Sequence, residues 1–291
     1  MPGSPYTDLD RPPLSAARLR RAVVAPHGPW RRLELVAETG STNADVVAAA
    51  LTGEPEGLVV VAERQTAGRG RRGRVWQSPP RAGIATSVLL RPGEAVPERG
   101  WSPVPPAGYG WLPLLAGVAL VEAVTRLAEL EAGLKWPNDL LIDGAKCAGV
   151  LAEAVPGTSP AQPPAIVVGV GLNVTLRADE LPVNPTGLPA TSLQLAGAAA
   201  TDRDPLLRAL LRSLADWYDR WRDTGGDAVA SGLRDAYLAG CATVGRQVRV
   251  LLPDGRDVRG TATGVDRDGQ LLVEGPDGEL RLAAGDVLHV R

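Results

Sequence analysis

Short apolar runs rich in valine and isoleucine, each bounded by glycine or polar residues, recur through the middle of the chain. Runs of about four to eight such residues are typical of β-strands. They predict strands over residues 58–62, 84–90, 133–136, 140–142, 148–155 and 166–174. A turn at Asp143-Gly144 between two of these runs is typical of a tight hairpin.

Helical periodicity appears in four other segments. The pattern predicts a short helix over 14–24, a helix that begins at Ser41–Asn43 with hydroxyl capping residues, and a long helix over about 112–131. A further helix begins at Asp204, with Pro205 in its first turn. Its apolar residues share one face, which we interpret as core packing rather than a cofactor site: Leu207, Leu210, Leu211, Leu214, Trp217, Tyr218 and Trp221.

After Gly240 the pattern changes to short apolar runs separated by the turn sequences "PDG" at Pro253, "RDG" at Arg267 and "PDG" at Pro276. Regular turns of this kind predict a small β-barrel of about fifty residues. We therefore divide the chain into an N-terminal segment with a short helix (1–30), a main domain (31–239) and a C-terminal barrel (240–291). The Pro/Gly-rich stretch 91–110 is expected to be a surface insertion without chemistry.

Composition narrows the class of protein. Of 291 residues, 44% are hydrophobic and the formal net charge is −2, with a pI near 5.8, so a general nucleic-acid binder is disfavoured. Cys147 and Cys241 lie far apart, which excludes a disulfide framework and a zinc site. His27 and His289 stand near the chain ends, which disfavours a Cys/His nucleophile. The apolar stretch at 112–124 is expected to be too short to span a bilayer, and residues 1–21 lack a signal-peptide apolar region, so a cytoplasmic protein is expected.

The stretch "AGRGRRGRVW", residues 67–76, concentrates three glycines and four arginines in ten positions. Its glycines satisfy G-x-G-x-x-G, but no strand runs straight into them and Pro79-Pro80 prevents a following helix, so a dinucleotide-binding turn is excluded. Kinase signatures and a Walker lysine are absent as well. Taken alone, the loop is either a solvated basic turn, an arginine-glycine segment for nucleic acid, or a device for binding an anion.

Three more stretches carry polar residues between apolar runs: "KWPNDLLIDGAKCAGVL" from Lys135, "GVGLNV" from Gly169 and "GSTN" from Gly40. Lys146 begins an apolar run, where a buried cation is costly unless an anion accompanies it. Several fixed cations with few proton-transfer groups suit the joining of two anions, such as a carboxylate attacking the α-phosphate of ATP. Glycines would let the arginine loop approach and close over such a ligand.

The set "GSTN", "QTAGRGRRGRVW", "KWPND", "KCAGVLAE" and "GVGLN", in this order and at these intervals, resembles the biotin protein ligases from about Trp30 through the C-terminal barrel. The resemblance implies an α+β fold: a catalytic domain like that of class II aminoacyl-tRNA synthetases, with a mixed, mainly antiparallel sheet, and a small barrel of Src-homology type. It implies synthesis of biotinyl-5′-AMP from biotin and Mg-ATP, then transfer of biotin to one lysine of a biotin carboxyl carrier domain of an acyl-CoA carboxylase.

The resemblance also implies roles for single residues. Lys146, Arg71 and Arg69 are the expected catalytic residues, with Lys146 reaching the biotin carboxylate and the α-phosphate. The biotin pocket is expected to comprise Ser41, Thr42, Asn43, Gln65, Arg69, Gly70, Arg71 and Lys146. Residues expected to face the nucleotide and its metal are Arg74, Trp76, Asn138, Asp139 and Asn173; none is assigned as a metal ligand.

Several alternatives stay open at this stage. Ser41 and Thr42 could be helix caps, and Asp139 could hold Lys135 or Arg71 instead of facing a metal, whereas Trp136 and Pro137 are expected to be architectural. Thr66 stands where relatives often carry glutamine, and Cys147 stands where leucine is common. Neither departure is expected to change the chemistry.

About thirty residues precede the catalytic domain, which is too few for a winged helix-turn-helix, so no DNA-binding domain is expected. No membrane partner is expected either. A lipoate ligase of the same fold is the nearest alternative function, and a non-enzymatic nucleic-acid-binding module is the more distant one.

Overall fold

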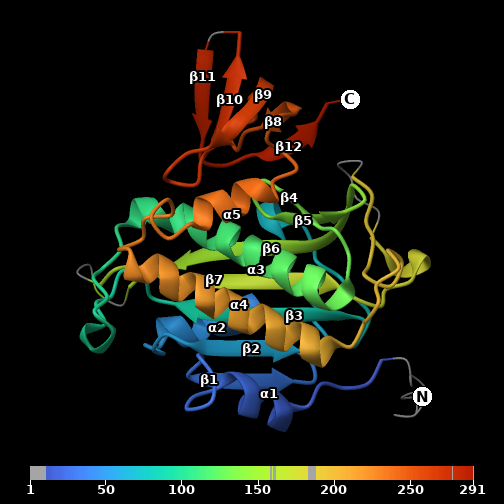
Figure 1. Ribbon diagram of the computed structural model, residues 1–291. Helices are drawn as coiled ribbons and strands as arrows, with labels where there is room; N and C mark the ends of the chain where they lie inside the picture. The colour runs from blue at the N-terminus through green and yellow to red at the C-terminus, as the bar shows by residue number, and fades with distance from the viewer. Residues whose placement is uncertain (1–10, 158, 160–161, 183–187, 277, 291) are drawn as a thin grey trace.

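A computed structural model describes residues 11–157, 159, 162–182, 188–276 and 278–290. A seven-stranded sheet forms its centre, in the order β1-β2-β3-β7-β6-β5-β4 (Figure 1). The strands are β1 Arg32–Val36, β2 Leu58–Ala62, β3 Gly83–Leu90, β4 Gly133–Lys135, β5 Asp139–Ile142, β6 Ala145–Val155 and β7 Ala165–Asn173. Only β1 and β2 pair in parallel among these strands. The expected mixed, mainly antiparallel sheet is thus confirmed.

Alternating side chains place helices on both faces of this sheet, because successive residues of a strand point to opposite sides. Val59 and Val61 belong to the large core with α3 and α4, whereas Leu58 and Val60 pack with α2. The helices are α1 Ala16–Val23, α2 Thr42–Leu51, α3 Trp111–Ala128, α4 Arg203–Asp223 and α5 Leu233–Ala239. Figure 1 shows α3 and α4 crossing one face of the sheet side by side.

Helix α3 requires a correction to the sequence analysis. Together with the turn before it, the segment Pro106–Ala128 is long and apolar enough to cross a bilayer by length and composition. However, 67% of its apolar window is buried inside the protein, where it packs against α4 and the sheet. Its apolar residues therefore form the core of the fold.

The C-terminal segment forms a second sheet of five antiparallel strands, in the order β11-β10-β9-β8-β12. The strands are β8 Gln247–Leu251, β9 Asp257–Val265, β10 Leu271–Gly275, β11 Gly278–Leu282 and β12 Asp286–His289. Two of the three predicted turns connect them as expected, and Asp277 of the third lies outside the described residues. The antiparallel β-structure is confirmed, and its closure into a barrel stays a prediction.

The two sheets share contacts through tryptophans of the larger unit. The indole N–H of Trp111 donates to the carbonyl of Arg267 at 2.7 Å, and that of Trp136 donates to the carbonyl of Gly269 at 3.1 Å. Trp136 is 1% exposed, consistent with an architectural role. Buried apolar residues of both sheets form one continuous core, so the predicted domain boundaries stay predictions.

The insertion 91–110 is held against helix α4 by contacts of Trp101. Trp101 is buried, packs edge-on against Tyr218 of α4, and has the guanidinium of the fully buried Arg222 over its ring. Its indole N–H donates to Asp223 at 2.7 Å. The sequence analysis interpreted the α4 aromatics as packing residues, and these contacts agree with that interpretation.

Candidate active site

A cavity of about 350 Å³ lies over β6 and β7 on the face that carries α2. Its walls are the beginning of α2, the arginine loop, the β4–β5 hairpin and the first residues of β12. All of the residues expected to bind biotin or the nucleotide line it: Ser41, Thr42, Asn43, Gln65, Arg69, Gly70, Arg71, Arg74, Trp76, Asn138, Asp139, Lys146 and Asn173. Segments more than a hundred residues apart in sequence thus contribute to one cavity.

Glycines of β6 and β7 form the floor. Gly149 and Gly171 are paired across the two strands, and the indole of Trp76 lies directly on both. A Cβ at Gly171 would collide with this ring, and a Cβ at Gly169 would collide with the amide of Asn43. The glycines of "GVGLN" therefore make room for two side chains of the site, a role that sequence analysis did not assign.

The beginning of α2 forms one end of the cavity. Ser41 occupies the N-cap position, but its hydroxyl makes no capping hydrogen bond. Gln65 takes over part of that function, because its Oε1 accepts from the backbone N–H of Thr42 at 2.9 Å and lies 3.1 Å from its hydroxyl. The buried hydroxyl of Ser87 lies 2.7 Å from that of Thr42. The polar groups are held in fixed positions, and the Ser41 hydroxyl has no capping role to compete with a ligand.

Asn43 uses both sides of its amide within the protein. Its Oδ1 lies 2.6 Å from the hydroxyl of Ser87, while its Nδ2 donates to the carbonyl of Leu151 at 3.2 Å and to Glu153 at 2.7 Å. The side chain lines the cavity and also joins α2 to β3 and β6. Ser87 and Glu153 hold this lining residue in place, and sequence analysis missed both, although Glu153 ends the quoted motif "KCAGVLAE".

Two lysines share one carboxylate at the other end of the cavity. Lys146 Nζ lies 2.6 Å from Asp139 Oδ1, and Lys135 Nζ lies 3.8 Å from Asp139 Oδ2. These are the only lysines of the chain. The turn between β5 and β6 has positive φ at Asp143 (49°) and Gly144 (75°), as the predicted hairpin requires. Burial lowers the pKa of Lys135, and the carboxylate of Asp139 opposes that shift.

The arginine loop folds back on itself above the floor. Arg69 pairs with Val75 in an isolated antiparallel bridge, and the N–H of Trp76 donates to the carbonyl of Gly68 at 2.9 Å. At the tip, Arg72 and Gly73 both have positive φ, 55° and 72°. A non-glycine residue in this region is uncommon, so the tip is a tight turn that glycine at 73 facilitates.

Counter-charges for the loop come from two distant elements. Arg69 lies 3.4 Å from Glu153 on β6, while Arg72 and Arg74 both contact the carboxylate of Asp286 at the start of β12. Sequence analysis did not foresee Asp286, because no local pattern distinguishes it from other acidic residues of the C-terminal segment. The arginines that would repel one another are thus partly neutralised before any ligand binds.

Arg71 contacts neutral groups rather than a carboxylate. Its Nη1 donates to Asn138 Oδ1 at 3.1 Å and to the carbonyl of Gly285 at 3.3 Å. Burial lowers the pKa of Arg71, and the charges of Asp286 and Asp139 oppose this shift. Since its charge has no direct ion-pair partner among the described residues, Arg71 can bind an anionic ligand without first breaking an ion pair.

Two asparagines fix the backbone at the end of the cavity that holds the lysines. Asn138 Nδ2 donates to the carbonyl of Val150 at 2.9 Å, and Asn173 Nδ2 donates to the carbonyl of Thr191 at 2.9 Å.

Within the described ranges, no three His, Cys, Asp or Glu side chains gather as a metal site would require. Burial raises the pKa of Cys147 to about 12, so this thiol is not a nucleophile near neutral pH.

The comparisons with known proteins agree with this geometry. Residues 39–173 match the Biotin/lipoate A/B protein ligase family, and residues 243–290 match the Biotin protein ligase C terminal domain. A biotin–[acetyl-CoA-carboxylase] ligase of Mycobacterium tuberculosis is 42% identical over 98% of this chain and 100% of its own length. One from Paracoccus denitrificans is 35% identical over 87% and 98%. The biotin protein ligase from Aquifex aeolicus, solved in complex with biotin and ATP, superimposes with a TM-score of 0.71 at 25% identity, covering 90% of this chain and all of that one.

Proposed function

Because this chain belongs to the biotin protein ligase family, we propose that it activates biotin with ATP and transfers it to a lysine of a biotin carboxyl carrier domain. The single observation that carries the proposal is the cavity itself. It joins a polar end at Ser41, Thr42 and Gln65 to a cationic end at Lys146 and Arg71. A ligand with a polar ring system and a terminal carboxylate fits that arrangement.

In the first half-reaction, a biotin carboxylate oxygen forms a bond to the α-phosphorus of ATP, and the bond to pyrophosphate breaks. We assign Lys146 to the point where the two anions would meet. The assignment is supported by its origin on β6 beside the floor and by its contact with Asp139 at 2.6 Å. Arg71 supplies a second charge whose direct partners are neutral. Both cations reduce the repulsion between reactants and stabilise charge developing on the phosphate oxygens.

In the second half-reaction, the amine of the carrier lysine attacks the acyl carbon of the mixed anhydride, AMP leaves, and the nitrogen loses a proton. The reacting carbonyl must be shielded from water until the carrier arrives. We assign this shielding to the arginine loop. Its Trp76 covers the glycine floor, and its Arg69, Arg71 and Arg74 line the cavity. We likewise propose that the carrier is the biotin carboxyl carrier domain of an acyl-CoA carboxylase, and that the fold combines a catalytic domain like that of class II synthetases with a Src-homology-type barrel.

We propose that magnesium enters with ATP as the Mg-ATP complex. The ion typically binds through phosphates, water and one or two carboxylates rather than a complete protein cage. Asp139 and Asp286 are the two carboxylates that line the cavity, and both are engaged by cations. Phosphate oxygens are therefore expected to supply most of the ligands. The reaction is proposed to take place in the cytoplasm, where both substrates are available.

Pyrophosphate release tests the proposed function. The purified chain is incubated with Mg-ATP and either biotin or lipoate, and an apo-carrier domain is then added. Release that depends on biotin, followed by a mass increase of one biotin on the carrier, is the expected result. Release that depends on lipoate instead would assign the chain to the lipoate branch of the family. If neither acid stimulates pyrophosphate release, ligase activity is refuted.

A further inference from the structure

A short N-terminal strap, residues 11–14, is fixed to the main domain at three points. The guanidinium of Arg203 donates to the carbonyl of Pro12 at 2.6 Å, and the N–H of Leu14 donates to Glu63 at 2.6 Å. Arg203 and Glu63 themselves form a buried ion pair at 2.7 Å. The third point is the side chain of Arg11. Since the backbone on its C-terminal side is already held, the direction of the Arg11 side chain is well defined.

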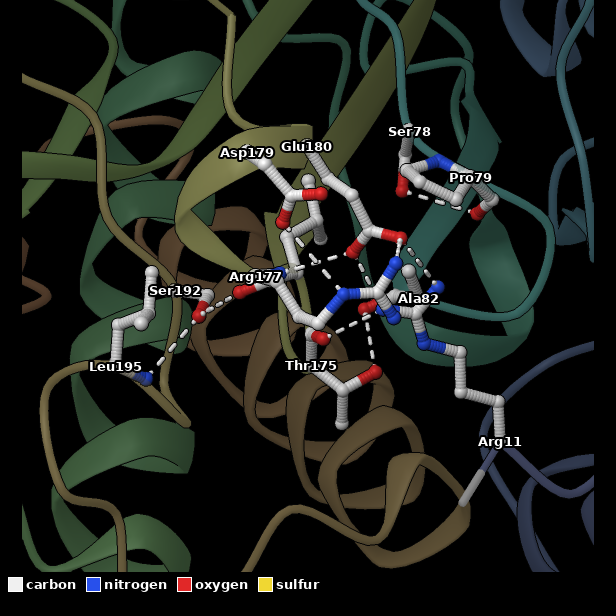
Figure 2. Close-up of polar contacts among 11 residues, drawn as sticks. Arg11, Ser78, Pro79, Ala82, Thr175, Arg177, Asp179, Glu180, Ser192 and Leu195 are labelled. Carbon is white, nitrogen blue, oxygen red and sulfur yellow. Dashed lines mark hydrogen bonds and ion pairs between the residues drawn. The ribbon is translucent and has the colours of Figure 1, made fainter. Parts of the chain in front are cut away.

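Arg11 is buried, and its guanidinium donates hydrogen bonds to the loop that follows β7 (Figure 2). Nη1 donates to Glu180 Oε1 at 3.2 Å, Nη2 donates to Glu180 Oε2 at 2.5 Å, and Nη2 also donates to the carbonyl of Thr175 at 2.8 Å. This two-pronged contact with a carboxylate fixes both distance and orientation. The hydrogen bond from Arg11 lowers the pKa of Glu180, so the carboxylate stays charged.

This loop leads into the cavity. Thr175 comes two residues after Asn173, which lines the cavity four residues along β7 from Gly169, the glycine beside Asn43. Glu180 also accepts from the backbone N–H of Arg177 at 2.9 Å, which closes a turn over Ala178–Glu180. Two residues later, Pro182 lines the cavity. The Arg11 contact therefore sets the position of a segment that bounds one end of the cavity.

We propose that Arg11 is a positioning residue for the nucleotide end of the site. It holds the loop from Thr175 to Pro182 in the conformation that receives ATP, and it has no part in the end that receives the biotin ring. Sequence analysis placed Arg11 in the N-terminal segment and assigned it no role. The inference rests on the proposed function, because it assigns the Asn173 end of the cavity to the nucleotide.

The test compares Arg11→Ala with the parent chain in steady-state pyrophosphate release. Loss of the contact should raise the KM for ATP about tenfold, because a small misplacement of a positioning segment is costly. The KM for biotin and kcat should change less than about twofold. Arg11→Lys keeps the charge but loses the two-pronged contact of the guanidinium. Its KM for ATP should therefore lie between those of the parent and Arg11→Ala. Arg18→Ala is the matched control, since Arg18 lies seven residues away in sequence and its side chain is 71% exposed.

A second readout does not depend on catalysis. Hydrogen exchange of the peptide covering 175–182, measured without ligands, should become faster in Arg11→Ala and stay unchanged in Arg18→Ala. Glu180→Gln also weakens the contacts of Glu180 with Arg177, so it should accelerate exchange by itself. The effects of Arg11→Ala and Glu180→Gln should be less than additive in the double variant, because the two side chains share one contact. An unchanged KM for ATP, or an equal rise in the KM for biotin, in a variant whose loop exchange is faster would overturn the positioning role. Absence of biotin-dependent release from the parent would refute the proposed function alone, since the exchange result stands without it.

Discussion

The strands that form the floor of the cavity and the arginine loop above them both carry cations but are built differently. Lys146 projects from β6, a strand paired on both sides, and its partner Asp139 lies on the adjacent strand. The arginines of the loop depend instead on Glu153 and Asp286, which are contributed by separate elements. A cation on paired strands keeps its place whether or not a ligand is bound, whereas ion pairs on a surface loop are exchanged for ligand contacts at low cost. The floor is suited to chemistry and the loop to closure.

Removal of the floor cation should have the largest effect. Lys146→Ala should reduce biotin-dependent pyrophosphate release on the order of a hundredfold, because one preorganised electrostatic donor is lost from the transition state. Asp139 would then keep Lys135, at 3.8 Å, as its ion-pair partner. Lys135→Ala, which removes the more distant lysine, is the informative comparison. A Lys146→Ala rate within threefold of the parent would exclude the proposed role.

Removal of the Arg71 charge should act mainly on retention of the adenylate. Arg71→Gly keeps the loop flexible and removes a guanidinium that has no direct ion-pair partner in the described part of the chain. The mixed anhydride should therefore escape and label bystander proteins about tenfold more, which corresponds to about 1.4 kcal/mol of binding. Labelling is measured on an added lysine-rich protein.

The enzyme itself provides an internal reference for this experiment. Its only lysines are Lys135 and Lys146, with side-chain exposures of 11% and 19%, so escaped adenylate should label the added protein rather than the enzyme. If Arg71→Gly forms adenylate and labels bystanders no more than the parent, retention does not depend on this residue.

Asp286 connects the C-terminal sheet to the loop, and its removal should produce a smaller change. Asp286→Asn removes the carboxylate shared by Arg72 and Arg74. Trypsin cleavage within residues 69–74 of the ligand-free chain should accelerate by a few-fold, as expected for the loss of partly exposed ion pairs. Asp254→Asn, in an exposed turn of the same sheet and paired with Arg256, is the control. Equal cleavage in both variants would mean that Asp286 does not restrain the loop.

The smallest expected effect concerns pH and the C-terminal sheet. Burial, with the charges of Lys135 and Arg246, lowers the pKa of His289 to about 4. The unfolded chain therefore binds a proton on this residue at higher pH than the folded chain does. Stability should be greatest above about pH 6.5 and should decrease as the pH falls toward 4. Urea unfolding at several pH values measures the free energy of unfolding, and His289→Gln should make that free energy less dependent on pH. If the pH dependence is unaltered in His289→Gln, His289 is not its cause.

Most strands and helices could be predicted from local pattern because their apolar runs are long or strongly periodic. Strand β1, with the sequence "RLELV", was missed because only Leu33 of its five residues is fully buried, and α5 was missed because it has only seven residues. The motifs predicted which residues would gather in the cavity. They could not predict Asp286 or Arg11, because an ion pair across more than a hundred and fifty residues leaves no trace in local spacing.

The contrast between floor and loop is tested most directly by one tryptic digest, because trypsin cleaves after both arginine and lysine. The chain is digested free and with saturating biotin and Mg-ATP, and cleavage is followed by mass spectrometry at Arg69–Arg74 and at Lys135 and Lys146. The account predicts rapid cleavage of the loop in the free chain, strong protection when ligands are bound, and slow cleavage at both lysines throughout. Equal loop cleavage with and without ligands would contradict closure over the adenylate, and lysine sites cut as fast as the loop would contradict the fixed floor.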